Sequence, residues 1–260
     1  VSIPNLEDQL SHLSKLLNNI QKALGEYLER QRTAFPRFYF CGDEDLLEII
    51  GNGKEPVKIL KHIGKMFAGI NTLELTGSEK RSVVAFASKE GEVVKLEEVQ
   101  NISAGAAVND YLRQIESAMR STLALLLDKA SASQALDDVE SKMDVFFDFI
   151  NELPAQIVIL SSQVMWSRTI ENAIDSLSSA ADRIELLLNS LADKVVQKVS
   201  PDRRKKYEQL MTEFVHQRDV TRQLIELKVD TVEDFYWLSQ LRYYYFPNEE
   251  QILQRLNARC

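Results

Sequence analysis

Residues 35–56 read FPRFYFCGDEDLLEIIGNGKEP, and this stretch decides how the chain around it is organised. It contains two prolines and three glycines, together with a compact acidic cluster. Proline lacks a backbone N–H and glycine is conformationally free, so both residues interrupt regular helices. The stretch therefore predicts short joints between helical segments, at Pro36, Gly42, Gly51, Gly53 and Pro56.

The order of residues inside the stretch predicts where helices end and begin at these joints. A residue that precedes proline avoids the helical region, so a helix should end at Phe35. Aromatic residues alternate with other residues in RFYF (37–40), which predicts an extended segment. Asp43 is expected to cap a short helix that Gly51 closes. Pro56 suits the first position of a further helix over residues 56–70.

Upstream of this stretch, apolar residues recur at alternating steps of four and three. They are Leu6, Leu10, Leu13, Leu17, Ile20, Leu24, Tyr27 and Leu28. This spacing places them on one stripe of a helix that runs to about Ala34. Two interpretations are open: the helix belongs to a coiled coil, or it lies along a single neighbour.

Downstream, the period changes to two from Thr72. Residues 72–75, 82–88 and 92–99 are rich in β-branched side chains that alternate with other residues. SKEGE (88–92) lies between the last two runs, and Gly91 can adopt a positive φ there. A small antiparallel sheet is therefore expected within an otherwise helical chain.

The remainder of the sequence has helical periodicity. Helices are expected over residues 109–128, 135–153, 154–177, 180–199, 200–228, 232–245 and 248–258. Ser200 should cap the longest of them, and proline stands at the expected start of the third. The predicted fold is mainly α, an elongated multi-helix bundle with one small antiparallel β element. We expect three parts: residues 1–70, 71–97 and 98–260.

Composition excludes several functional classes. The 260 residues are 45% apolar and 27% charged, with a net charge of −8, which does not favour nucleic acid or an anionic membrane as a partner. No apolar run reaches the roughly 20 residues of a membrane span. Cys41 and Cys260 are far apart, and the start lacks Met and a signal sequence. These features predict a piece of a longer chain from a reducing compartment.

Motifs for catalysis and for cofactor binding are missing. GNGKEP (51–56) lacks the GxxxxGK[ST] pattern, so we interpret it as a loop between two helices. His12, His62 and His216 lie on three predicted helices without a second ligand nearby, which disfavours a metal site. The acidic residues 43–45 are typical of a helix start, and no serine lies in a nucleophile motif. We predict no catalytic residue, cofactor or metal in this segment.

One charged segment is a candidate for interaction. Arg203, Arg204, Lys205 and Lys206 lie at the start of the longest helix, where cations oppose the helix dipole. An acidic partner would explain them; alternatively, they form a solvated basic turn that Asp202 and Glu208 compensate.

Other polar and aromatic residues favour structural roles. Arg218 and Asp219 in residues 215–222 are expected to join a network with neighbouring helices. Trp166 and Trp237 are expected in the core, and the aromatic run 241–246 suits packing against a segment that follows.

Four segments resemble the linker region of cytoplasmic dynein heavy chains, in the order and spacing of that family. They are residues 35–70, 153–174, 207–225 and 235–252, and the resemblance covers about 30–257. It implies a helical rod lying across a ring of AAA+ modules. In that ring, outside this segment, ATP and Mg²⁺ are bound and ATP is hydrolysed. It also implies a force-transmitting, cytoplasmic and cytoskeletal element, with the ring, dynein complex subunits and microtubules as partners and with no nucleic acid or membrane.

The resemblance adds a second interaction candidate and a place for the bend. The hairpin at 82–96 resembles a small β element of the linker that faces ring insertions, which makes Lys89, Glu90 and Gly91 candidate contacts. The bend of the family's linker falls near the first helix and residues 37–45. This segment is then the more rigid C-terminal half of the linker.

Two other functions remain as alternatives. The chain is a static helical scaffold or adaptor that binds protein partners, or it is an enzyme whose site has no recognisable motif. Movement that depends on nucleotide separates the lever from the scaffold, and ATP turnover by the segment alone separates the enzyme from both.

Overall fold

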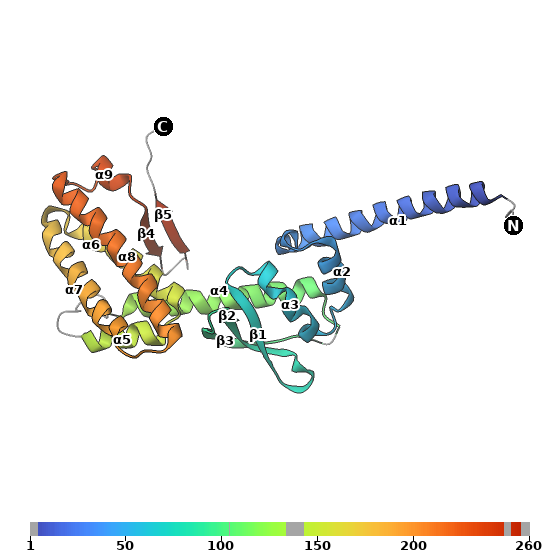
Figure 1. Cartoon of the computed structure of the whole chain (residues 1–260), viewed down its shortest axis with the longest axis horizontal. Helices are drawn as coiled ribbons and strands as arrows, with labels where there is room; N and C mark the ends of the chain where they lie inside the picture. Colours follow the sequence, from blue (N-terminus) through green and yellow to red (C-terminus); the bar gives the residue numbers. More distant parts are fainter. Residues whose placement is uncertain (1–4, 104, 134–142, 247–250, 256–260) are drawn as a thin grey trace. The chain divides into compact units, whose positions relative to one another are not determined.

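The computed structural model describes residues 5–103, 105–133, 143–246 and 251–255 (Figure 1). The chain divides into two compact units, residues 1–119 and residues 120–260, and each is described by itself. The fold is mainly α with a small antiparallel sheet, as predicted. The three-part division expected from the sequence stays a prediction.

The first unit contains helices followed by a three-stranded sheet. Its elements are α1 (Leu6–Ala34), the 3₁₀ helix η1 (Pro36–Phe40), α2 (Asp43–Gly51), α3 (Pro56–Met66), β1 (Ile70–Thr76), η2 (Ser78–Lys80), β2 (Ser82–Ser88), β3 (Val93–Asn101) and the first half of α4 (Val108–Ala132). The predicted helix over 6–34, the end of the short helix at Gly51 and the helix start at Pro56 are confirmed.

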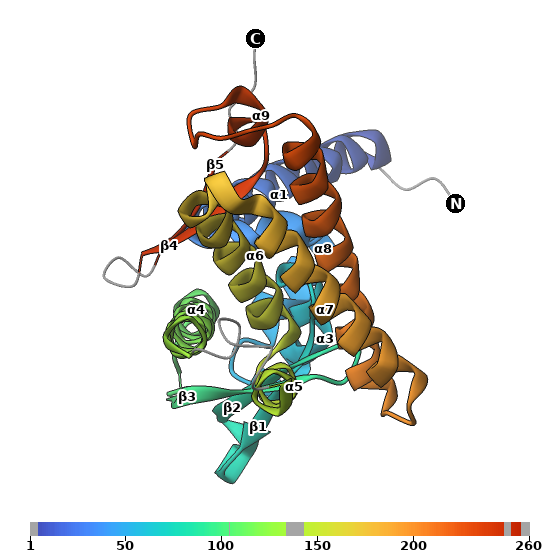
Figure 2. The same cartoon turned by 90° about the vertical axis from the view of Figure 1, so that its left-hand side faces the viewer.

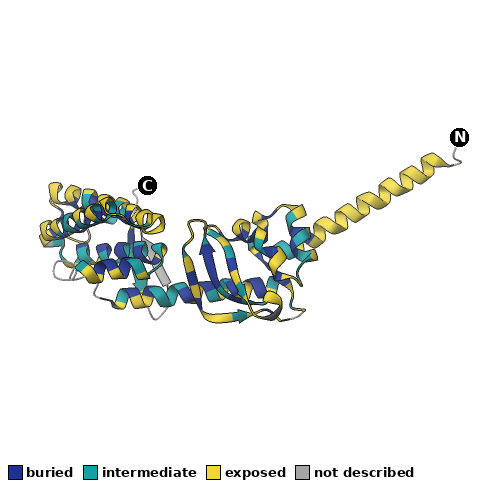
Figure 3. Ribbon diagram, turned by 60° about the horizontal axis from the view of Figure 1, so that its bottom comes forward, coloured by how far each residue is buried: buried dark blue, intermediate teal, exposed yellow. Residues whose placement is uncertain are grey.

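Helix α1 exposes the apolar stripe that the sequence predicted. Figure 3 shows α1 exposed along most of its length. Leu17 and Ile20 are exposed to 65% and 62%, whereas Leu28 in the last part of the helix is exposed to 2%. Only the C-terminal end of α1 is therefore buried in the core of the first unit.

Two of the elements predicted in this unit differ from the structure. RFYF is not extended but lies in η1, because Phe38 turns into the core, where it is fully buried. Helix α3 ends at Met66, four residues before the predicted end. The chain then turns at Gly69, whose φ of 84° suits glycine, and enters β1 at Ile70.

The sheet has the strand order β1-β2-β3, with both pairs antiparallel. Leu73 pairs with Phe86, which pairs with Val94, so these three buried side chains form one row across the sheet. Helix α3 packs against β1. The turn between β2 and β3 has Gly91 at a φ of 92°, which confirms the predicted hairpin.

The second unit is a helical bundle with a two-stranded sheet. It contains the second half of α4, α5 (Met143–Glu152), α6 (Ala155–Asn172), η4 (Ile174–Ser176), α7 (Leu177–Val196), α8 (Pro201–Glu226), α9 (Phe235–Leu238), β4 (Arg242–Phe246) and β5 (Gln251–Arg255). Figure 2 shows α6, α7 and α8 side by side, and α8 packs against both of the other helices. The part of the predicted helix over 135–142 lies outside the described residues.

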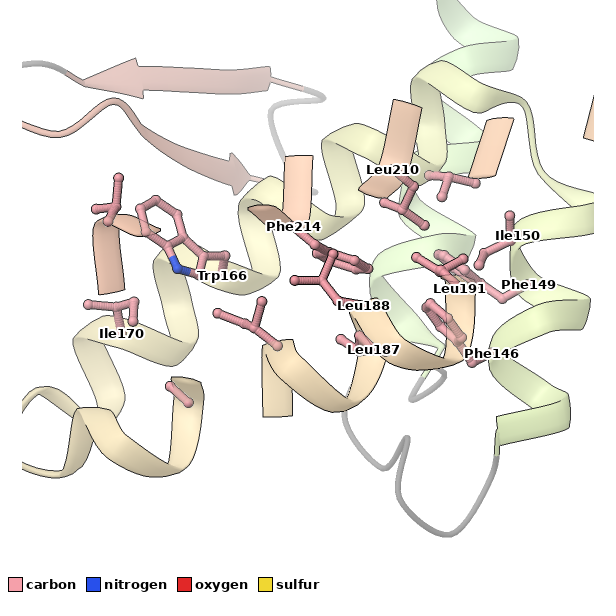
Figure 4. Packing of buried hydrophobic residues seen from close by; sticks show 14 of the residues in the cluster. Phe146, Phe149, Ile150, Trp166, Ile170, Leu187, Leu188, Leu191, Leu210 and Phe214 are labelled. Atoms are coloured by element: carbon pink, nitrogen blue, oxygen red, sulfur yellow. The ribbon is translucent and has the colours of Figure 1, made fainter. Parts of the chain in front are cut away.

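Apolar side chains from α5, α6, α7 and α8 meet in one core (Figure 4). Phe146 and Ile150 of α5 are fully buried, as are Leu191 of α7 and Leu210 of α8. These residues recur at helical spacing on faces that point toward one another, so burial of apolar surface stabilises the bundle.

Both tryptophans lie in the core of the second unit, as predicted. Their rings are 5.4 Å apart at 70°, an edge-to-face arrangement. Trp166 Nε1 donates to Thr221 Oγ1 over 3.1 Å, and Trp237 Nε1 donates to Glu171 Oε1 over 3.4 Å. The buried N–H groups are therefore satisfied, which keeps the cost of burying them low.

The end of the chain contradicts the predicted helices over 232–245 and 248–258. Among the described residues of these two ranges, only Phe235–Leu238 is helical, and Arg242–Phe246 pairs with Gln251–Arg255 as an antiparallel hairpin. Aromatic side chains favour strands, and the run of three tyrosines and a phenylalanine outweighs the helical pattern. Residues 247–250 and 256–258 lie outside the described residues.

Replacement of Leu28 by alanine should destabilise the chain much more than replacement of Leu17. Leu28→Ala removes a buried side chain and should lower the free energy of unfolding by about 2–4 kcal/mol. Leu17→Ala removes an exposed one and should change it by less than about 0.5 kcal/mol. Urea unfolding at low protein concentration measures both changes, and equal losses would contradict the exposure of α1.

Replacement of Thr221 by valine should destabilise the second unit. The change keeps the shape of the side chain but leaves Trp166 Nε1 buried without an acceptor, at a cost of about 1–3 kcal/mol. Thr212→Val is the matched control, because Thr212 lies on the same helix, is exposed and makes the same bond to the preceding turn. Thermal unfolding of both variants tests the prediction, which fails if the two variants unfold alike.

Candidate functional site

The predicted joints coincide with boundaries between short elements. Pro36 opens η1, Gly42 precedes α2, Gly51 is the last residue of α2, and Pro56 opens α3. Gly53 lies in the loop between α2 and α3, where an added Cβ would be 3.2 Å from Ile50 O. Whether the chain bends at these positions stays a prediction.

The region from the end of α1 to α3, here called the junction (residues 28–66), has a buried apolar centre. The rings of Phe35 and Phe38 lie 5.0 Å apart at 75°. Both are buried, and Leu46 and Ile49 of α2 are fully buried as well. Close packing of this kind resists deformation, so the junction holds the elements it joins in a fixed geometry.

Polar contacts lock the end of α1 to the elements that follow. Arg32 donates to Asp43 Oδ1 over 2.6 Å and to the carbonyl oxygen of Cys41 over 3.3 Å. Tyr39 Oη donates to Glu29 Oε1 over 2.6 Å. The predicted capping role of Asp43 is wrong: it is the first residue of α2, no side chain caps this helix, and its carboxylate binds Arg32 instead.

A second set of polar contacts connects α2 to α3, and no sequence pattern predicts it. Lys65 donates to Asp45 Oδ2 over 2.7 Å, and Lys61 donates to Glu48. The buried His62 lies between these carboxylates, with Nδ1 3.5 Å from Asp45 Oδ1 and Nε2 3.2 Å from Glu48 Oε2. The acidic cluster thus belongs to a charged cluster that includes three side chains from α3.

This cluster changes the acidity of its members. The hydrogen bond from Lys65 lowers the pKa of Asp45, and the hydrogen bond from Lys61 lowers the pKa of Glu48. The same contact with Asp45 raises the pKa of Lys65. Each shift favours the charged form, so the cluster favours the folded junction near neutral pH.

The hairpin tip with Lys89, Glu90 and Gly91 is exposed and well ordered by local bonds. Ser88 Oγ accepts from the backbone N–H groups of Glu90 and Glu92 over 3.2 and 3.3 Å. The tip therefore keeps one shape on the surface of the first unit. Its proposed contact with a ring remains a prediction.

The four basic residues at the start of α8 differ in their surroundings. Arg203, Arg204 and Lys205 are exposed, whereas Lys206 Nζ donates to the carbonyl oxygen of Leu153 over 2.7 Å. Ser200 occupies the predicted N-cap position, but its side chain accepts no capping bond. Instead, a hydrogen bond from Ser200 is the main cause that lowers the pKa of Asp202.

The side chains in the middle of α8 that contact neighbouring helices are not the predicted ones. Arg218 binds the adjacent Asp219 over 2.8 Å on the surface. The contacts with neighbouring helices come instead from other residues: Thr221 with Trp166, and Arg222 with Glu185 over 2.6 Å. The prediction that Arg218 and Asp219 join neighbouring helices is therefore wrong, and Thr221 and Arg222 make such contacts instead.

A groove in the second unit lies between α4, α6 and β4. It is lined by Asp128, Ser131, Ala132, Val164, Arg168, Glu171, Asn172 and residues 243–246. Tyr244 Oη donates to Glu171 Oε1 over 2.5 Å, and the N–H of Tyr243 donates to Ser167 Oγ over 3.0 Å. The polar groups near the groove therefore hold β4 against α6.

The described part of the chain shows no constellation for catalysis. It contains no group of three or more His, Cys, Asp or Glu residues that could hold a metal ion. Among these residues, no helix is long and apolar enough to cross a membrane. GNGKEP spans the end of α2 and the loop before α3, as expected.

Comparison with known proteins identifies the family. Residues 1–130 match the family model described as dynein heavy chain, N-terminal region 2. The chain is 43% identical to a cytoplasmic dynein heavy chain of Dictyostelium discoideum over 98% of its length, 43% identical to one of Neurospora crassa over 100%, and 41% identical to one of Drosophila melanogaster over 98%. The chain belongs to the dynein heavy chain family. It spans about 6% of the length of these curated relatives.

Loss of the carboxylates in the charged cluster should flatten the pH dependence of stability. A carboxylate with a lowered pKa stabilises the folded state above its unfolded pKa, about 4, and this contribution is lost as the pH falls through the lowered folded value. We therefore expect Tm to fall less between about pH 5 and about pH 2 in Asp45→Asn/Glu48→Gln than in the original chain.

The control for this experiment removes two carboxylates elsewhere. Glu226 and Asp230 are exposed and make no ion pair within the described residues. The variant Glu226→Gln/Asp230→Asn should keep the original slope of Tm against pH. An unchanged slope in Asp45→Asn/Glu48→Gln would show that the cluster does not act in this way.

Proposed function

We propose that the chain is a force-transmitting part of a dynein heavy chain, the C-terminal half of its linker, and has no active site of its own. The observation that carries this proposal is the junction, where buried rings and ion pairs fix the end of α1 against α2 and α3. Membership in the dynein heavy chain family supports it, because a motor must connect its ATPase to its load.

The construction of each unit supports a mechanical role. A densely packed body transmits strain because its side chains cannot be rearranged without loss of contacts. Force passes through such a body, and bending concentrates in joints at element boundaries. Pro36, Gly42, Gly51, Gly53 and Pro56 stand at such boundaries or in the loop between them. They remain the candidates for these joints, and a bend at any of them must break contacts of the junction, which otherwise hold these elements in place.

The proposal assigns the chemistry to the remainder of the heavy chain. ATP binds with Mg²⁺ in its AAA+ ring and is hydrolysed there. The linker bends and docks on the ring in response to the nucleotide state. The other proposed partners are dynein complex subunits and, through the whole heavy chain, microtubules. The proposed location is the cytoplasm, on the cytoskeleton.

A static scaffold is the second candidate, and the exposed stripe of α1 favours it. An apolar helical face of this length is typical of a surface that binds another helix. A scaffold would use this face without any change of shape during ATP turnover. The lever and the scaffold can therefore have the same residues and the same fold. They differ in whether the chain moves during ATP turnover.

Distance measurements in the whole heavy chain test the lever. Gln209→Cys places a fluorophore on an exposed position of α8, and a second fluorophore is attached to the ring. We expect the distance between them to change between the ATP-bound and the nucleotide-free state. No change would support the scaffold and contradict the lever.

Two controls make the test specific. Fluorophores at Ser178→Cys and Gln209→Cys both lie on exposed positions of the second unit, and their distance should stay constant in every nucleotide state. The 260-residue chain alone should hydrolyse no ATP above background. Turnover by this chain would instead indicate an active site within it.

A further inference from the structure

The segment from Lys194 to Lys206, here called the basic turn, concentrates positive charge in an acidic chain. It carries six cations, Lys194, Lys198, Arg203, Arg204, Lys205 and Lys206, and one carboxylate, Asp202, so its net charge is +5 where the whole chain has −8. It connects the end of α7 to the start of α8. We propose that the basic turn docks onto an acidic segment of the same heavy chain that lies outside these 260 residues.

The six cations fall into two groups. Lys194 and Lys206 are engaged with α5: the Nζ atom of Lys194 lies 4.8 Å from the centre of the Phe147 ring, and Lys206 binds the carbonyl oxygen of Leu153. These two residues hold the basic turn on the bundle. The other four cations are exposed, and none of them forms an ion pair within the described residues.

The carboxylates of this region do not neutralise the exposed group. Asp202 lies in the first turn of α8, where the hydrogen bond from Ser200 and nearby backbone N–H groups hold its charge, and it acts on Arg203 through space. Glu208 is exposed and makes no ion pair in the part of the chain that the structure describes. The positive end of the α8 dipole adds to the same field. The surface therefore attracts carboxylates.

The basic turn also presents an apolar side chain. Val196, at the end of α7, is exposed to 87%, and Lys198 follows two residues later. A surface that combines cations with an exposed aliphatic group suits a polypeptide with acidic and apolar side chains. It suits a nucleic acid less well, because a nucleic acid would meet the cations but leave Val196 exposed.

The weakness of surface ion pairs indicates where the partner comes from. Pairs between exposed charges contribute little to affinity and are screened by salt, so a free acidic peptide would bind this surface poorly. A segment of the same polypeptide that reaches this surface meets it at a higher effective concentration than a free peptide, so weak contacts are sufficient. The relatives are much longer than this chain, so a heavy chain offers many such segments. The inference rests on family membership and, within the proposed function, assigns one docking surface.

Zero-length cross-linking in the whole heavy chain tests the inference. A carbodiimide joins a lysine only to a carboxylate in direct contact, and mass spectrometry then identifies both residues. We expect Lys198 and Lys205 to be joined to a single acidic segment outside residues 1–260. The yield should fall by about threefold or more when salt is raised from about 0.05 M to about 0.5 M.

Charge reversal beside the reporting lysines gives the decisive variant. Arg203→Glu/Arg204→Glu leaves Lys198 and Lys205 available but reverses the field around them, and it should remove most of these cross-links. The fold should persist, because carboxylates near the start of α8 favour the helix dipole. Circular dichroism and thermal unfolding check this.

The matched control is Lys95→Glu/Lys228→Glu, which changes the net charge equally at two exposed lysines without an ion pair in the described residues. It should leave the cross-links unchanged. Cross-links scattered over many segments, or no loss in Arg203→Glu/Arg204→Glu, would overturn the inference. Cross-links to another subunit or protection by duplex DNA would also overturn it. A fixed linker-to-ring distance would contradict the proposed lever but would leave this docking surface intact.

Discussion

The rest of the first unit depends on the buried pair of rings where α1 ends. Phe35 leaves the helical region before Pro36, and its ring packs on Phe38 one turn of 3₁₀ helix later. This contact turns the chain and places Asp43 beside Arg32. Together with the Arg32–Asp43 ion pair and the Tyr39–Glu29 hydrogen bond, it fixes α2 and α3 relative to the end of α1.

The polar contacts of the junction restrict how α1, α2 and α3 are oriented on their shared apolar core. Arg32 and Tyr39 hold the end of α1, whereas Lys61, His62 and Lys65 hold α2 on α3. Exposed ion pairs are individually weak, but several in one place restrict the orientations that the elements can adopt. A lever needs this restriction, since force applied to α1 is otherwise lost in local rearrangement. The same restriction would serve a scaffold, which is why motion must separate the two functions.

The sequence predicted most helix boundaries because prolines and glycines mark them locally. The starts at Pro56 and Pro201 and the turn at Gly91 follow from backbone chemistry alone. The errors arise where contacts between residues far apart in the sequence determine the local structure. Phe38 is buried in the core, and residues 37–40 therefore form a 3₁₀ helix although their pattern is that of an extended segment. Likewise, β4 forms because it pairs with β5, and the charged cluster forms because α3 folds back on α2. The burial of Phe38 and the charged cluster leave no local signal, whereas the aromatic run of β4 is a local signal for a strand that the helical pattern obscured.

The flanks of the α1 stripe indicate what kind of partner this helix suits. In a two-stranded coiled coil, the positions beside the stripe usually carry opposite charges that pair across the interface. Here, Ser14 and Gln21 flank it on one side, and Leu16 and Ala23 flank it on the other. Leu16 is itself exposed, which widens the apolar face beyond a narrow seam. The stripe therefore favours the packing of a helical bundle over a coiled coil selected by ion pairs.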